Sequence, residues 1–174
     1  MLVVPLSLAS GVPAAAAHLT AVASATAYNL GLKATLFSPV PYAVSFALLP
    51  AFVTLGLTHA HWPPVWVTAA AALIGVGGHF AQARPDVERD RRQRVIGLPQ
   101  LAGDRASALA AAAFLAAAAV TIAIGTRSLV PLLAVPPAIG VALTPPAVAF
   151  RLTLLTAGLT VLILLVNGGS LASR

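Results

Sequence analysis

Six long apolar stretches occupy most of this 174-residue chain and restrict the folds open to it. A helix that crosses the hydrocarbon core of a bilayer needs about 20 mostly apolar residues. The predicted spans are residues 3–27, 39–58, 63–80, 106–126, 128–145 and 150–168. Because lipid offers the backbone no hydrogen-bond partners, we expect an all-α integral membrane protein. It would be a bundle of about six transmembrane helices forming a single transmembrane domain, residues 1–174.

Composition supports lipid as the environment of these stretches. Hydrophobic residues make up 59% of the chain and the mean hydropathy is +0.95, whereas soluble domains are ~45–50% apolar. The absence of cysteine excludes disulfides, a thiol nucleophile and a cysteine-ligated metal. A net charge of +6 could indicate nucleic-acid binding, but in so apolar a chain it fits basic cytoplasmic loops better. We therefore expect membrane lipid, and no nucleic acid, as a partner.

Basic residues are distributed unevenly over the connections between the predicted spans. If the spans alternate in direction, one side of the membrane receives eight of the ten basic residues and the other receives Arg127 and Arg174. The eight are Lys33, Arg84, Arg89, Arg91, Arg92, Arg94, Arg105 and Arg151. By the positive-inside rule, this asymmetry predicts a multi-pass protein with a cytoplasmic loop at 81–105 and both termini outside.

The 81–105 loop contains all four acidic residues of the chain: Asp86, Glu88, Asp90 and Asp104. If the loop is helical, Asp86 and Asp90 lie on one face with Cβ atoms ~5–6 Å apart. Such a pair is tolerated when a cation lies between the carboxylates, and Mg²⁺ binds one or two carboxylates together with waters and phosphate oxygens. Nearby arginines can bind phosphate oxygens bidentately, so the pattern indicates a diphosphate site at the membrane surface. The alternative is a topology-setting loop whose acids and arginines pair with one another.

Three further polar residues have structural interpretations. His18 and His79 lie within predicted spans, and we expect each to be hydrogen-bonded in helix packing rather than catalytic. Asp104 follows a glycine just before an alanine-rich span, so it is predicted to cap the helix that starts near Arg105.

The surroundings of the central loop resemble the second aspartate-rich motif of the UbiA family of intramembrane prenyltransferases. The similar run comprises His79-Phe80-Ala81-Gln82, Pro85-Asp86-Val87-Glu88-Arg89-Asp90 and Gly97-Leu98-Pro99-Gln100-Leu101-Ala102-Gly103. Upstream, Tyr28 and Lys33 are similar to the tyrosine and lysine of the family's connection between its fourth and fifth helices. Residues 36–50 are similar to some bacterial members, so a bacterial plasma membrane is the expected location.

The resemblance implies a nine-helix prenyltransferase fold in which the six spans correspond to helices four to nine. The family carries a first aspartate-rich motif between helices two and three, and no acid outside 86–104 could replace it here. The resemblance therefore implies the C-terminal portion of a prenyltransferase, inactive alone, with a partner chain that could supply the missing helices.

The resemblance also implies an activity and a cofactor. Asp86 and Asp90 would hold Mg²⁺, and the enzyme would transfer an isoprenoid group from a prenyl diphosphate to an aromatic or other acceptor. The alternative hypothesis is a non-catalytic membrane protein or one half of a split enzyme.

The same comparison assigns contacts to the diphosphate. Gln82 stands where the family has an asparagine, and Arg94 stands where it has a small glycine. The residues expected to bind the diphosphate are Tyr28, Lys33, Gln82, Arg92 and Arg94.

Overall fold

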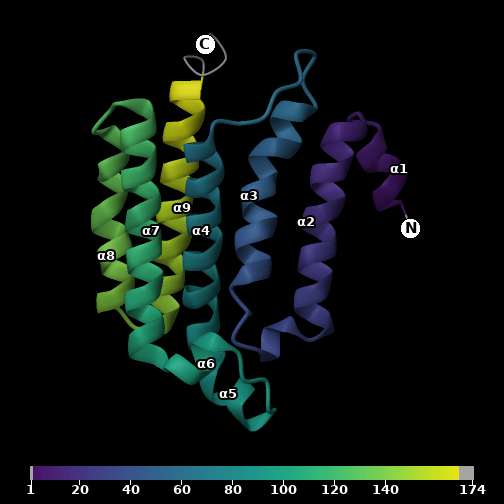
Figure 1. The fold of residues 1–174 in the computed structure, drawn as a ribbon. Helices are drawn as coiled ribbons and strands as arrows, with labels where there is room; N and C mark the ends of the chain where they lie inside the picture. Colours follow the sequence, from purple (N-terminus) through teal and green to yellow (C-terminus); the bar gives the residue numbers. More distant parts are fainter. Residues whose placement is uncertain (1, 169–174) are drawn as a thin grey trace.

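The computed structural model describes residues 2–168, and its regular secondary structure there is entirely helical (Figure 1). The longer helices are α2 (Val12–Leu30), α3 (Val40–Leu55), α4 (Val65–Ala83), α7 (Asp104–Thr126), α8 (Val135–Leu143) and α9 (Pro146–Gly168). The short helices are α1 (Val3–Leu8), α5 (Val87–Arg92), α6 (Leu98–Ala102), η1 (Leu32–Ala34), η2 (Arg84–Asp86) and η3 (Val130–Ala134), of which the η elements are 3₁₀ turns.

Three helical segments of the described chain are long and apolar enough to cross a membrane. They are Val65–Arg92, which joins α4, η2 and α5, then Asp104–Thr126 and Pro146–Val166. Val40–Leu55 and Val130–Leu143 are apolar but shorter. Large apolar side chains are exposed along the outer faces of these helices, as contact with lipid requires. The predicted all-α membrane fold is confirmed.

The first and last predicted spans differ from the observed helices. The first span, 3–27, is not one helix, because Gly11 has a φ of 92° and separates α1 from α2. Pro13 then lies in the first turn of α2, where its missing N–H is no loss. The last helix begins at Pro146 rather than at residue 150, again with a proline in the first turn.

Helix α4 is the centre of the bundle. It packs against α3 on one side and against α7 and α9 on the other, while α2 packs against the far side of α3. Glycines permit these close approaches: a Cβ on Gly75 would lie 2.6 Å from the carbonyl oxygen of Tyr42, and one on Gly77 would lie 2.9 Å from Cγ of Leu115. One buried cluster joins α4, α7, α8 and α9, and a second joins α2 to α3.

The polar connections gather at one end of the bundle. Figure 1 shows α5, α6 and the α2–α3 connection together there, with the α3–α4 connection at the opposite end. Helix α7 starts beside α6 and ends at that opposite end, where Arg127 follows it. Arg174 lies outside the described residues. Which end faces the cytoplasm stays a prediction.

Candidate functional site

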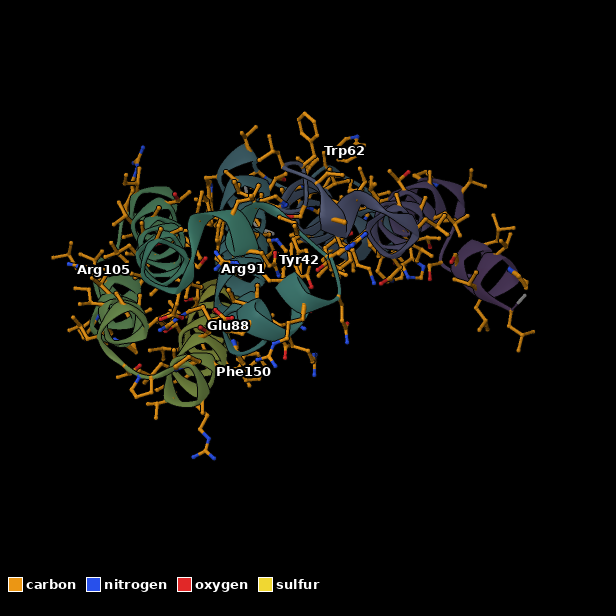
Figure 2. All side chains as sticks on the ribbon, turned by 90° about the horizontal axis from the view of Figure 1, so that it is seen from below. Tyr42, Trp62, Glu88, Arg91, Arg105 and Phe150 are labelled. Atoms are coloured by element: carbon orange, nitrogen blue, oxygen red, sulfur yellow. The ribbon has the colours of Figure 1, made fainter. Side chains whose placement is uncertain are left out.

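The two aspartates of the central loop lie on a continuous helical path. The segment Val65–Arg92 is helical throughout, with Asp86 ending η2 and Asp90 within α5. The aspartates are therefore one turn apart along the same side of the helix, which is what a shared cation site requires. Glu88 lies between them in sequence, is exposed, and has Oε1 3.9 Å from Nη1 of Arg91. Figure 2 views the bundle from the end that bears α5 and α6, and Glu88 and Arg91 lie near its middle.

Each aspartate has one oxygen engaged by a protein group. Oδ1 of Asp86 lies 2.9 Å from Nη2 of Arg89, an exposed pair. Oδ2 of Asp90 accepts a hydrogen bond of 2.8 Å from Nε2 of Gln100. Within residues 2–168, the other oxygen of each carboxylate has no hydrogen-bond or ion-pair partner. One oxygen on each aspartate therefore remains open to a ligand.

The segment that follows α5 is docked against the α2–α3 connection. The main-chain N–H of Leu98 donates to Oγ of Ser38 at 3.1 Å, and Nε2 of His79 lies 3.1 Å from the same oxygen. Gly97 lies so close to the main chain of Lys33 that a Cβ on Gly97 would overlap the carbonyl oxygen of Lys33. Ser38 and His79 are buried, and the predicted packing role of His79 is confirmed. The two connections form one structural unit.

A polar pocket opens beside this unit, with a volume of about 420 Å³. Its lining residues come from α2, α3 and α4: Ala25, Tyr28, Asn29, Pro41, Tyr42, Ser45, Phe46 and Gln82. The rings of Tyr28 and Tyr42 meet edge-on with centroids 5.2 Å apart, and the Tyr42 hydroxyl donates to Oε1 of Gln82 at 3.2 Å. The structure thus brings Tyr28 and Gln82 together at this pocket and adds Tyr42, which was not predicted. Asp90 is not one of the lining residues.

The other three residues predicted to bind phosphate, Lys33, Arg92 and Arg94, are basic side chains without an ion-pair partner among the described residues. Arg92 and Arg94 are exposed, and Lys33 is half-buried in η1. No ion pair or side-chain hydrogen bond involves these three within the described part of the chain. Their positive charges are therefore available to an anion.

Arg84 and Asp104 form an ion pair that the sequence did not suggest. Nε of Arg84 lies 2.8 Å from Oδ1 of Asp104, and the guanidinium also donates to the carbonyl oxygens of Val141 and Thr144 at 2.8 and 3.2 Å. The predicted cap by Asp104 is wrong: Gly103, with a φ of 85°, is the N-cap of α7, and no side chain caps that end. Asp104 is instead the first residue of the helix, with both carboxylate oxygens bonded to Arg84.

An apolar groove adjoins the polar pocket. It has a volume of about 610 Å³ and is lined mainly by apolar side chains of α3, α4 and α9 and by the prolines of the α3–α4 connection. Phe46 lines both the groove and the pocket. A molecule with a polar head and a long apolar tail could occupy both spaces at once.

Comparison with known proteins found one matching family model. A family model described as the UbiA prenyltransferase family matches residues 1–157. The match includes the α2–α3 connection, the whole of 81–105 and the first half of α9. No match was found among the curated proteins or among the solved structures. Because this family model matches most of the chain, the chain belongs to the UbiA prenyltransferase family.

Proposed function

We propose that the chain carries the second aspartate-rich part of a Mg²⁺-dependent prenyltransferase site. This site would transfer an isoprenoid group from a prenyl diphosphate to an aromatic or other electron-rich acceptor. Family membership supports membrane prenyl transfer in general. The observation that supports the specific assignment most is the docking of Gly97 and Leu98 against Lys33 and Ser38, because it joins the segment that follows the two aspartates to the connection that carries Lys33.

The donor set at this end fits Mg²⁺. Asp86 and Asp90 each offer a free carboxylate oxygen, and Mg²⁺ characteristically takes one or two carboxylates and completes its shell with waters and phosphate oxygens. We assign these two aspartates as the donors. Among residues 2–168, no group of three or more His, Asp or Glu side chains could hold a metal ion. When bound, Mg²⁺ neutralises negative charge on the diphosphate leaving group.

Three basic side chains would bind the rest of the diphosphate. Arg92 and Arg94 can each take two phosphate oxygens, and Lys33 adds a point charge from the α2–α3 connection. Tyr28 and Gln82 would line the same site. In the transfer, the bond between the allylic carbon and the diphosphate oxygen breaks, and its electron pair leaves with the diphosphate. The acceptor forms the new carbon bond and loses a proton.

The apolar groove would hold the isoprenoid tail. Its wall is mostly hydrocarbon, so a prenyl chain placed there would contact mainly apolar side chains. Phe46 stands at the junction of groove and pocket, where the tail would meet the diphosphate.

Two wider features are part of the same proposal. The family pattern also has the first aspartate-rich motif, which this sequence lacks. We propose that another protein segment or a partner chain provides it. The end that bears α5 and α6 would face the cytoplasm of a bacterial plasma membrane, since the basic residues concentrate there.

One observation favours the alternative of a non-catalytic membrane protein. Asp86 pairs with Arg89 at 2.9 Å, as expected of a loop whose charges serve topology alone. In that case the carboxylates would have no role in ligand binding.

Binding of a prenyl diphosphate separates the two functions. The purified protein in detergent should retain radiolabelled farnesyl diphosphate in the presence of Mg²⁺ and lose it when EDTA is added. Equal retention with and without Mg²⁺, or no retention at all, would favour the non-catalytic alternative.

A further inference from the structure

We propose that Gln100 is a positioning residue that orients the carboxylate of Asp90 for its cation. Gln100 lies in α6, ten residues after Asp90, and is 5% exposed. Its side chain contacts the proposed cation site through Asp90, to which its amide donates. The inference rests on the proposed function.

The amide of Gln100 has only one permissible orientation. The main-chain N–H of Gly97 donates to Oε1 of Gln100 at 3.2 Å, and only the oxygen of an amide can accept that bond. Nε2 is consequently turned toward Oδ2 of Asp90, 2.8 Å away. The third residue of α6 thus accepts from the N-cap N–H with one atom of its amide and donates to a carboxylate with the other.

The backbone that carries Gln100 is fixed from both sides. Nε of Arg91 donates to the carbonyl oxygen of Gln100 at 3.0 Å, which ties α5 to α6. Oγ of the buried Ser107 donates to the carbonyl oxygen of Pro99 at 3.1 Å, which ties α6 to α7. The amide is thus a rigid donor to Oδ2 of Asp90, and Oδ1 is the oxygen left for a cation. Groups that hydrogen-bond a ligating carboxylate in this way set its direction.

Two substitutions at Gln100 should both raise the Mg²⁺ requirement. Gln100→Met keeps the length of the side chain but removes the donor to Asp90 and the acceptor for the Gly97 N–H, so the Mg²⁺ concentration for half-maximal farnesyl diphosphate binding should rise about 10- to 100-fold. Gln100→Glu keeps the acceptor for the Gly97 N–H but has no donor for Asp90, so it should raise the Mg²⁺ concentration required as well. Added negative charge without a positioning effect would lower it instead.

Ser107→Ala is the matched control. It also removes a buried hydrogen bond of α6, but one in which neither Gln100 nor Asp90 takes part. We expect it to lower the unfolding temperature about as much as Gln100→Met does and to leave the Mg²⁺ midpoint unchanged.

The outcomes are distinguishable from failure of the proposed function. Wild-type protein that shows no Mg²⁺-dependent binding would overturn the proposed function and this inference together. If wild type binds but Gln100→Met shifts the midpoint no more than Ser107→Ala, the positioning role alone is overturned. Should Gln100→Met fail to fold, Gln100→Glu decides: a raised midpoint supports the role, and an unchanged or lowered midpoint overturns it.

Discussion

Replacement of Arg84 by methionine should destabilise the protein far more than the same replacement of Arg89. Both arginines pair with an aspartate at nearly the same distance, 2.8 Å to Asp104 and 2.9 Å to Asp86. They differ in environment, because the Arg84 side chain is 3% exposed and the Arg89 side chain is 66% exposed.

The size of the expected loss in unfolding free energy follows from the acceptors that lose their donor when Arg84 is replaced. The carbonyl of Val141 would normally bond the N–H four residues later, but that residue is Pro145, which has none. Arg84 supplies the missing donor, and its loss would leave a buried carbonyl unpaired at a cost of ~1–3 kcal/mol. Asp104 is 53% exposed, so solvent screens its charge and the ion pair adds only ~0–1 kcal/mol. We expect Arg84→Met to lower the free energy of unfolding by about 1–4 kcal/mol.

Reversible unfolding by SDS in mixed micelles measures this difference. Arg89→Met should change the free energy of unfolding by no more than ~0.5 kcal/mol, as exposed substitutions usually do. Arg84→Lys keeps the charge but cannot bridge the same acceptors, so it should fall between wild type and Arg84→Met. Equal losses for Arg84→Met and Arg89→Met would refute the reasoning.

Two other predictions concern the cavities and the topology. Phe46→Ala should weaken Mg²⁺-dependent binding of farnesyl diphosphate and leave binding of inorganic diphosphate unchanged, because Phe46 borders both cavities but carries no charge. Competition assays measure both affinities. Equal losses for the two ligands would contradict the placement of the diphosphate in the pocket and the isoprenoid tail in the groove. Since the chain has no cysteine, single cysteines can report topology: Gln93→Cys should react with an impermeant maleimide only from the cytoplasmic side, and Ala60→Cys only from outside. The reverse labelling would show that the charge asymmetry was misinterpreted.

The membrane fold could be predicted because hydrophobic length is a local property. The stretches that became α3, α4, α7 and α9 are visible in the sequence without knowledge of their neighbours. The break at Gly11 was missed because the residues on both sides of it are equally apolar, and hydropathy does not register a change of φ.

The long-range polar contacts could not be predicted from spacing. Arg84 pairs with Asp104, twenty positions away, and with the carbonyl of Val141 on α8. No local sequence pattern indicates these contacts. Pro145 was the available signal, since a proline removes the donor for Val141. For Gln100 the signal was its position three residues after Gly97 at the start of a helix, since a glutamine there can accept from the N-cap N–H.

Loss of Mg²⁺-dependent farnesyl diphosphate binding on substitution of the aspartates tests the central claim most directly. The variants are Asp86→Asn, Asp90→Asn and, as the matched control, Glu88→Gln, which removes a carboxylate from the same stretch. Glu88 points about 200° around the helix from Asp86, and its oxygen lies 3.9 Å from Arg91. We predict that either asparagine abolishes the Mg²⁺-dependent component and that Glu88→Gln leaves it intact. Equal loss in all three variants, or retention in both asparagine variants, would contradict a cation site shared by Asp86 and Asp90.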